Sequence, residues 1–307
     1  MGSHTVDRLL AEGHEVIGVD SYITGRREFL AYANANPRFN LIVGDLFDFT
    51  TVIEACEGVD AVFHLAANTD VRHGTDYPRR DLDQNVIVTW NILEAMRRRD
   101  IKTILFSSTA AIYGDTTLLP TPEDGPLPIQ TSLQSASKLA AEAFISAYAQ
   151  GYGIRALVFR FASVVGERCT HGHIFDFCRQ LRSHPDRLEV LGDGAVRRSY
   201  VDVADCVDAM LLALHHPTSP VEVFNVGSLR PCELTESIGW ISSALNIQPA
   251  VEFSGPGPAW VGSCPVIFLD CTKLHRLGWQ PKLDPEAAVR RTVHYLAANP
   301  RLLEPRA

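Results

Sequence analysis

Polar side chains stand at the ends of several short apolar runs, where they could bind and orient a small polar molecule. Asp20 closes the run EVIGVD, and Asp45 follows NLIVG. Ser107, Ser108 and Thr109 close IKTILFSST. A carboxylate accepts hydrogen bonds from ligand hydroxyls, whereas a hydroxyl side chain both donates and accepts them. These residue types predict a ligand that is held by hydrogen bonds.

A metal centre is not expected. Cys169, His171 and His173 lie close together, but their spacing matches no zinc-binding pattern. The chain has seven cysteines without a Cys-x-x-Cys pair, and its N-terminus has no basic segment followed by an apolar one. We therefore expect reduced thiols and a cytoplasmic location.

The elements that must position these residues alternate between strands and helices. Apolar runs rich in Val, Ile, Leu and Phe occupy 15–20, 40–44, 59–65, 101–107 and 154–160. Helical patterns separate them, at 3–12, 50–56, 81–99 and 132–151. Strands of this composition are typically buried on both faces of a parallel sheet. The alternation predicts an α/β fold with a doubly wound parallel sheet, whose ligands bind outside the carboxyl ends of the strands.

The pattern changes after about residue 165. Helices are expected near 174–184, 203–216, 234–245 and 285–298, with short strands near 188–191 and 221–226. We expect residues 1–165 to form the domain that contains this sheet and its ligand-binding edge. Residues 166–307 are expected to form mainly a smaller, substrate-capping lobe, with some elements that pack back on the sheet.

Composition excludes two classes of partner. The 307-residue chain has a formal net charge of -8, and its basic runs at 79–80 and 97–99 are short. Nucleic acid is therefore not the expected partner. No apolar run approaches the roughly 18 residues of a membrane-spanning helix, so no membrane partner is expected either.

A set of motifs carries a resemblance over nearly the whole chain. In order they are GSHTVDRLLAEGHEVIGVD, GDLFD, HLAA, DQNVIVTWNILEA, SSTAAIYG, SASKLAAE, GDGAVRRSYVDVADCVDA, FNVG and LGWQP. They resemble the extended short-chain dehydrogenase/reductases, in particular the NAD-dependent nucleotide-sugar epimerases and dehydratases of UDP-glucose 4-epimerase-like type. The resemblance implies a Rossmann-type sheet, bound NAD and a UDP-sugar substrate.

The resemblance also implies roles for residues that hold the cofactor. Asp20 would accept hydrogen bonds from the adenosine ribose diol and repel a 2′-phosphate, which favours NAD over NADP. Asp45 and Leu46 would contact the adenine, and Lys138 would bond the nicotinamide ribose. Small residues after the fourth family strand would let NAD approach the backbone. The remaining members of the implied cofactor site are Gly2, Leu65, Ala66, Ala67, Asn85 and Ser107.

On the substrate side, the resemblance makes Thr109 the residue that orients the reacting sugar hydroxyl. Arg198 would bind the diphosphate, for which a guanidinium is well suited. Ser163 stands where the family often has an asparagine that helps to hold the diphosphate. Family dehydratases carry an Asp-Glu pair after the threonine, and decarboxylases carry an acidic residue there, but this chain has Ala110 and Ala111. The expected reaction is therefore 4-epimerisation through a 4-keto intermediate.

The main departure lies in the catalytic set, which the resemblance assigns to Thr109, Gln134 and Lys138. The family's catalytic tyrosine precedes the lysine by four residues, and this chain has Gln134 there. An amide donates and accepts hydrogen bonds but takes no proton near neutral pH. Reduced activity is expected, unless another group such as His73 serves as base. The alternatives are a catalytically impaired homologue that binds NAD or a nucleotide sugar, and another NAD-dependent sugar-nucleotide oxidoreductase.

Two further expectations concern the N-terminus and association. The family opens with a strand and a Gly-rich turn whose backbone N–H groups hold the pyrophosphate. Here only Gly2 matches that turn, so weak NAD binding and unpaired edges on the neighbouring strands are expected. A second substrate-site departure stands at 260–263, where the family has Arg-x-Gly-Asp. Family members commonly dimerise through the helices that correspond to 81–99 and 132–151, which predicts a homodimer.

Overall fold

The computed structural model describes residues 1–68, 76–216, 219–257 and 264–304. The chain divides into two compact units that interleave along the sequence. The first unit comprises Met1–Ile112, Ser132–Arg160 and Val207–Phe224. The second comprises Tyr113–Thr131, Phe161–Cys206 and Asn225–Ala307. The functional division after residue 165 stays a prediction.

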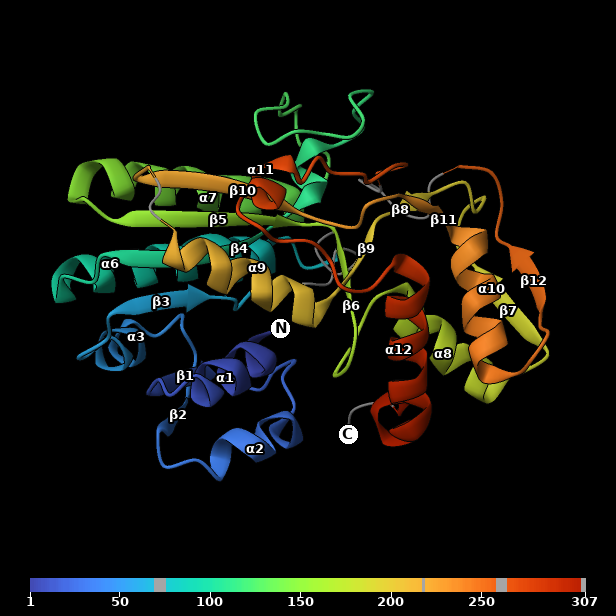
Figure 1. The fold of residues 1–307 in the computed structure, drawn as a ribbon, viewed down its shortest axis with the longest axis horizontal. Coiled ribbons are helices and arrows are strands. Elements are labelled where there is room, and N and C mark those ends of the chain that lie inside the picture. Colours follow the sequence, from blue (N-terminus) through green and yellow to red (C-terminus); the bar gives the residue numbers. More distant parts are fainter. Residues whose placement is uncertain (69–75, 217–218, 258–263, 305–307) are drawn as a thin grey trace. The chain divides into compact units, whose positions relative to one another are not determined.

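Parallel strands form the framework of the first unit (Figure 1). β1 (Val16–Asp20) pairs in parallel with β2 (Phe39–Val43). A four-stranded sheet has the order β10, β5, β4, β3, and its β3 and β4 are parallel. These four strands are β10 (Val221–Val226), β5 (Arg155–Phe161), β4 (Thr103–Thr109) and β3 (Ala61–His64). The mixed α/β fold with a parallel central sheet is confirmed.

Helices occupy the segments between these strands. They are α1 (Gly2–Ala11), α2 (Ala31–Asn34), α3 (Phe49–Ala55), α5 (Pro78–Asp81), α6 (Val88–Arg99) and α7 (Leu133–Tyr152). The sequence did not predict α2 or the 3₁₀ turn at Arg27–Leu30, because four residues are too few to show a helical period.

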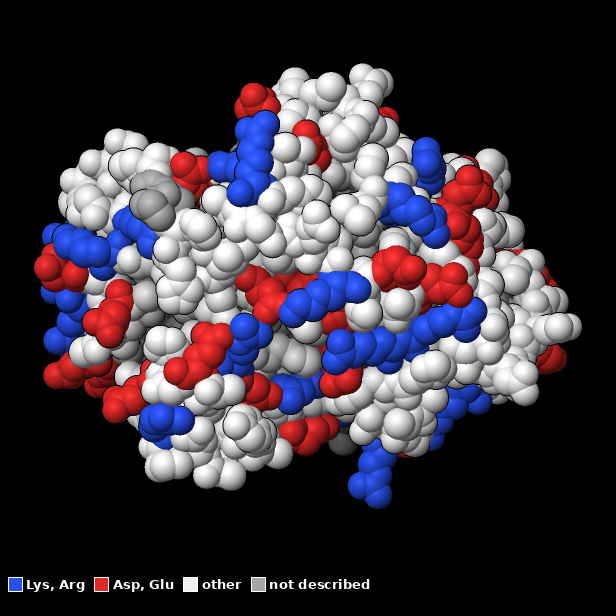
Figure 2. Space-filling model, in the orientation of Figure 1, with Lys and Arg blue, Asp and Glu red and all other residues white. Residues whose placement is uncertain are grey.

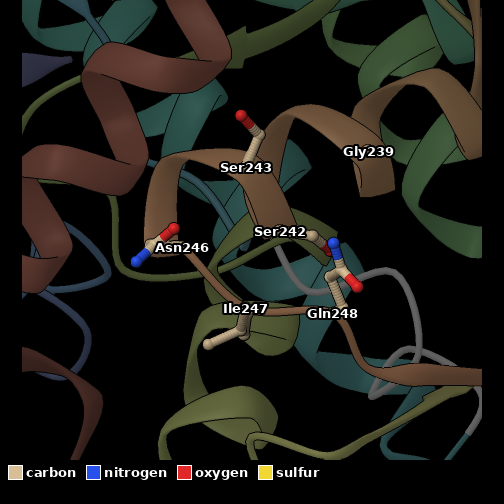
Figure 3. A pocket seen from close by; sticks show the side chains of 6 residues that line it. All are labelled: Gly239, Ser242, Ser243, Asn246, Ile247 and Gln248. Carbon is tan, nitrogen blue, oxygen red and sulfur yellow. The ribbon is translucent and has the colours of Figure 1, made fainter.

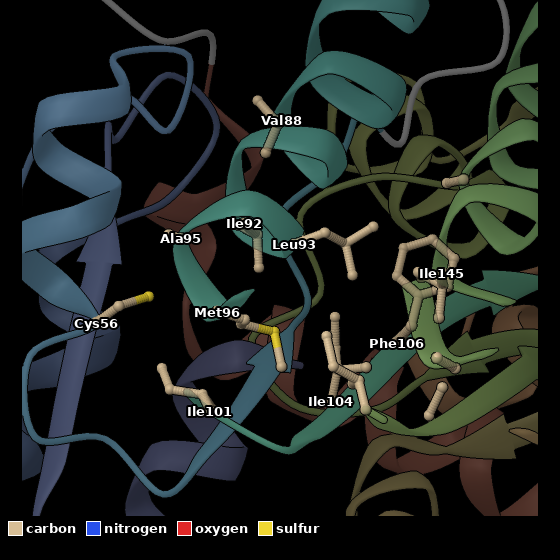
Figure 4. Packing of buried hydrophobic residues seen from close by; sticks show 14 of the residues in the cluster. Cys56, Val88, Ile92, Leu93, Ala95, Met96, Ile101, Ile104, Phe106 and Ile145 are labelled. Atoms are coloured by element: carbon tan, nitrogen blue, oxygen red, sulfur yellow. The ribbon is translucent and has the colours of Figure 1, made fainter. Parts of the chain in front are cut away.

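A continuous hydrophobic core anchors α6 and α7 on the strands (Figure 4). Leu93 and Met96 of α6, Ile104 and Phe106 of β4, and Ile145 of α7 are all fully buried. Complete burial of such a side chain contributes about 1.5–3 kcal/mol. This packing fixes the helix that carries Lys138.

The helix expected over 81–99 is interrupted. α5 ends at Asp81, and a π-helical segment, Leu82–Ile87, joins it to α6. Asp81, Asn85 and Thr89 are all buried, and their spacing of four residues places them on one side of this segment.

β1 and β3 belong to separate sheets. β1 pairs with β2 and β3 pairs with β4, and no ladder joins β1 to β3 within the described part of the chain. Ile17 in β1 is 39% exposed, whereas strands of a parallel sheet are normally covered on both faces. Each of these strands therefore has one edge whose backbone groups take part in no ladder there.

Shorter pairs of strands organise the second unit. β6 (Ser163–Val165) is parallel to β9 (Tyr200–Asp202), and β7 (Arg187–Val190) is parallel to β12 (Ala250–Phe253). β8 (Arg197–Arg198) runs antiparallel to β11 (Cys232–Glu233). The helices of this unit are α8 (His173–Ser183), α10 (Leu234–Leu245), α11 (Thr272–Arg276) and α12 (Pro285–Ala298). α9 (Val203–His215) begins in this unit and continues into the first from Val207.

Two observations concern the apolarity of the helices and the charges on the surface. Among the described residues, no helix combines the length and apolarity that a membrane crossing requires. Figure 2 shows lysine and arginine side chains interspersed with aspartate and glutamate on the face that it presents.

Candidate active site

α7 carries two of the three residues in the predicted catalytic set, Gln134 and Lys138. Ser132 caps its N-terminus, where the Ser132 Oγ accepts a hydrogen bond from the Ser135 backbone N–H at 3.1 Å. This start places Gln134 in the first turn and Lys138 one turn later. Residues four apart face the same side of a helix, as the catalytic hypothesis requires.

Lys138 lies at the carboxyl end of β4. Its Nζ donates a hydrogen bond to the Ser107 carbonyl at 2.7 Å and lies 4.6 Å from the centre of the Phe106 ring. The side chain is 4% exposed. Burial lowers the pKa of Lys138 to about 8, although the carboxylates of Glu142 and Asp81 oppose the shift. The structure therefore unites two predicted site residues, Ser107 and Lys138.

Gln134 has a buried acceptor without a protein partner. The residue is 9% exposed, and its Oε1 has no hydrogen-bond partner among the described residues. A buried polar atom left unpaired costs about 1–3 kcal/mol. A ligand hydroxyl would satisfy this atom by donating to it.

Thr109 ends β4, where its Oγ1 accepts a hydrogen bond from the Ala111 backbone N–H at 3.2 Å. That bond leaves the hydroxyl hydrogen of Thr109 to a second partner. The side chain is half-buried, so the strand end fixes its direction while the hydroxyl stays accessible to a ligand.

His64 is a buried residue near Lys138 that was not singled out from the sequence. It ends β3, and its Nε2 is hydrogen-bonded to the Thr89 Oγ1 at 2.8 Å. Burial, with a smaller contribution from the Lys138 charge, lowers the pKa of His64 to about 3. The imidazole is therefore neutral at physiological pH. Its place at a strand end, within the HLAA motif, was the available signal.

Asn85 organises a buried polar network around the loop that follows β3. Its Oδ1 accepts a hydrogen bond from the Asn68 backbone N–H at 3.0 Å. Its Nδ2 donates to Asp81 Oδ1 at 3.2 Å and to Ser137 Oγ at 2.8 Å. The Asn68 Nδ2 also donates to Asp81 Oδ1, at 2.9 Å. These bonds tie α7 and the π-helical segment to the loop. Of the four residues, only Asn85 was predicted from the sequence.

Replacing Asn85 with alanine is expected to lower the free energy of unfolding by about 1–3 kcal/mol, because it leaves buried partners unpaired. Urea denaturation measures this change. Asn40→Ala is the matched control, since Asn40 is exposed on β2. Equal stability losses in the two variants would contradict the importance of the network.

The predicted adenosine contacts lie at the ends of β1 and β2. Asp20 Oδ1 accepts a hydrogen bond from the Tyr22 backbone N–H at 2.7 Å. A β-carbon on Gly25 would stand 2.8 Å from the other oxygen, Asp20 Oδ2, so a larger residue there would displace the carboxylate. Asp45 Oδ1 accepts a hydrogen bond from the Phe47 backbone N–H at 2.9 Å, as in a turn. The Leu46 carbonyl accepts one from the Asn91 side chain at 3.0 Å.

The remaining predicted cofactor residues are small or apolar. Gly2 is the first residue of α1, and a β-carbon there would meet no atom within 4 Å. Leu65, Ala66 and Ala67 follow β3, with Ala66 exposed and the other two half-buried.

Ser163 and Arg198 belong to the second unit. Ser163 begins β6 and is register partner to Tyr200 of β9. The Arg198 Nη1 donates a hydrogen bond to the Cys264 carbonyl at 2.7 Å. Burial lowers the pKa of Arg198, and none of the described carboxylates forms an ion pair with it. Arg198 is half-buried, and a guanidinium of this kind suits an anionic ligand group.

The second unit contains a hollow of its own. A polar cavity of about 460 Å³ lies near the end of α10 (Figure 3). Its lining carries no charged side chain: it consists of Gly239, Ser242, Ser243, Asn246, Ile247 and Gln248. His73 and the stretch 260–263 lie outside the described residues.

Comparison with known proteins gives one consistent result. Residues 1–227 match the NAD dependent epimerase/dehydratase family. The chain is 31% identical to a putative UDP-glucose 4-epimerase of Methanocaldococcus jannaschii, over 98% of this chain and 96% of that protein. It is 37% identical to a UDP-galactose 4-epimerase of known structure, with a TM-score of 0.87 over 97% and 95% of the two chains. A UDP-glucose 4-epimerase of Thermus thermophilus, solved with NAD, gives 30% identity and a TM-score of 0.85 over 96% and 95%.

Lys138 lies buried at the carboxyl end of a parallel strand, which is where open α/β sheets bind their ligands. The chain belongs to the NAD dependent epimerase/dehydratase family. The residues present fit NAD in two respects. Asp20 ends β1 as an acceptor for ribose hydroxyls, and Lys138 Nζ has three donor hydrogens, of which the Ser107 carbonyl needs one.

Proposed function

We propose that the chain is a slow UDP-sugar 4-epimerase. The observation that carries the proposal is the pairing of Gln134 and Lys138 on one buried face of α7, beside the end of β4. The named epimerases among its relatives support the substrate class. Ala110 and Ala111 after Thr109 support epimerisation over elimination or decarboxylation, since neither supplies an acid or base.

When bound, NAD supplies the acceptor and donor of the hydride at the reacting sugar carbon. The chain's own residues bind and orient the substrate. Thr109 and Gln134 would hydrogen-bond the reacting hydroxyl, and Lys138 would hold the nicotinamide ribose. Arg198 and Ser163 would bind the diphosphate. The site would also need to let the keto sugar turn over, so that the hydroxyl re-forms with the opposite configuration.

Slow turnover follows from the proton that this reaction must move. The Gln134 amide accepts a hydrogen bond but no proton near neutral pH. His64 has a pKa of about 3 and is buried, so it is a weak base. Positioned general-base catalysis contributes about 10²- to 10⁴-fold, and the chain lacks the family's residue for it.

A coupled assay of UDP-glucose and UDP-galactose interconversion tests the proposal. We expect measurable but slow turnover, together with NADH absorbance when protein, NAD+ and UDP-sugar are mixed. Tight binding without hydride transfer would instead favour the second candidate function, a catalytically impaired nucleotide-sugar-binding homologue. The observation that favours this second candidate is Gln134 itself.

We also propose a homodimer formed through α6 and α7, which contact each other in the first unit. Trp90 is 41% exposed, and Phe144 and Tyr152 are 42% and 48% exposed. Large exposed apolar side chains on neighbouring helices are typical of a protein interface.

Light scattering is expected to give a mass about twice 33.9 kDa at micromolar concentration. The double change Trp90→Glu and Phe144→Glu is expected to give the single-chain mass, because it places charges on the interface. Tyr32→Glu is the control, since Tyr32 is 57% exposed on α2. A single-chain mass for the unmodified protein would refute the dimer.

We finally propose a cytoplasmic location. All seven cysteines are free thiols, and six of them are buried. Reduced cysteines are typical of intracellular compartments.

A further inference from the structure

Three buried polar side chains form a row along α7: Gln134, Lys138 and Glu142. They are 9%, 4% and 6% exposed. Their spacing of four residues places them one turn apart on the same side of the helix. The proposed function uses the first two, but it gives no role to Glu142.

Glu142 is held from two neighbouring strands. Its Oε1 accepts hydrogen bonds from the Ser108 Oγ of β4 and from the Arg160 Nε of β5, the latter at 3.2 Å. Its Oε2 accepts a bond from Arg160 Nη2 at 2.8 Å. The ion pair is buried on both sides, at 6% and 8% side-chain exposure. Both carboxylate oxygens are therefore fixed in position.

The titratable groups around Lys138 come from four elements. β3 contributes His64, which is neutral, and α5 contributes Asp81. α7 contributes Glu142, and β5 contributes Arg160 as the partner of Glu142. Burial favours the neutral amine of Lys138, whereas Glu142 provides the largest opposing effect and Asp81 the next. Removing the Glu142 charge therefore favours the neutral amine further.

We propose that Glu142 is a positioning residue: clamped by Ser108 and Arg160, it keeps Lys138 an ammonium directed at the end of β4. This inference rests on the proposed function for its catalytic meaning, since an ammonium donates all three of its hydrogens while a neutral amine donates two. The charged form can serve the Ser107 carbonyl and both hydroxyls of a ribose at once. Glu142 would thus act on the cofactor through Lys138, without touching it.

The ionisation of Lys138 can be read directly by trace acetylation with acetic anhydride at pH 6–10, followed by peptide mass spectrometry. Only the neutral amine reacts. In the unmodified chain the midpoint is expected near the Lys138 pKa of about 8. In Glu142→Gln it is expected about one pH unit lower, which raises the reactivity of Lys138 at pH 7 by about fivefold. Lys102, which is exposed, is the control lysine in the same digest.

Two companion variants keep the test decisive. Glu142→Asp retains the charge and is expected to keep the midpoint near that of the unmodified chain. The double variant Glu142→Gln with Arg160→Gln removes the uncompensated Arg160 charge, in case Glu142→Gln alone fails to fold. Its midpoint is expected to fall by a smaller amount, because removing the positive charge of Arg160 partly offsets removing the negative charge of Glu142. A net fall is still expected, since Glu142 lies on the same helix as Lys138 whereas Arg160 reaches from β5. Coincident labelling curves in all folded variants would overturn the inference.

NAD titration against pH separates the inference from the proposed function. Affinity is expected to decline as pH rises through the Lys138 midpoint, and to decline at lower pH in Glu142→Gln. An affinity profile that Glu142→Gln leaves unchanged, despite a shifted labelling curve, would overturn the link to the cofactor. Absence of epimerase turnover in the unmodified chain would overturn the proposed function, while the labelling curves would still decide whether Glu142 controls Lys138.

Discussion

Replacing Gln134 with tyrosine is expected to raise the turnover of UDP-glucose 4-epimerisation by about 10²- to 10⁴-fold. The phenol would enter the first turn of α7, one turn before Lys138 and in place of an amide whose Oε1 is unpaired. A nearby ammonium stabilises a phenolate and so lowers the pKa of a tyrosine. The variant therefore gains a proton acceptor on the face where Gln134 provides only a hydrogen bond.

Gln150→Tyr is the matched control for this prediction, because Gln150 lies on the same helix and is exposed. Both variants are compared with the unmodified chain at saturating NAD, so that differences in cofactor occupancy do not enter. The prediction is wrong if Gln134→Tyr gains nothing while NAD stays bound. It is equally wrong if the unmodified chain already turns over at an ordinary rate of ~1–10³ s⁻¹.

Extending the chain ahead of Gly2 by an apolar strand and a Gly-x-x-Gly-x-x-Gly turn is expected to tighten NAD binding by about 100-fold. Two added backbone hydrogen bonds to a charged pyrophosphate, at about 1.5 kcal/mol each, give that factor. The added strand also has two edges to pair with, since no ladder joins β1 to β3 among the described residues.

Isothermal titration calorimetry with NAD measures the gain. The control is an extension of equal length in which the three turn glycines are replaced by alanine. The control extension still supplies the strand, but the alanine side chains in its turn obstruct a close approach of the pyrophosphate to the backbone. Equal affinity for the extended and unextended chains would refute the predicted effect of the turn.

The periodic elements of the fold could be predicted from the sequence. The strand expected over 101–107 appears as Thr103–Thr109, and the helix expected over 285–298 appears as Pro285–Ala298. Each combines a clear apolar pattern with turn residues at its ends. The antiparallel pair β8 and β11 was not predicted, because strands of two residues carry no pattern of their own.

The polar contacts of the site were only partly predictable. Motif matches pointed to Lys138 and Asn85, but nothing in the local sequence joined Asn85 to Ser137 or Glu142 to Arg160. These partners are separated by 52 and 18 residues. Burial and hydrogen bonding across the fold decide such pairs, whereas hydrophobic periodicity reports only which side of an element faces the core.

The Asn85 network has a consequence for directed evolution of this chain. Its members share hydrogen bonds within a buried space, so a change at one position disturbs the bonds of the others, and their energetic effects are not additive. Libraries that vary Asn68, Asp81, Asn85 or Ser137 singly should yield mostly damaged proteins. Joint randomisation of the four positions should recover compensated combinations, including apolar ones, that stepwise selection would not reach.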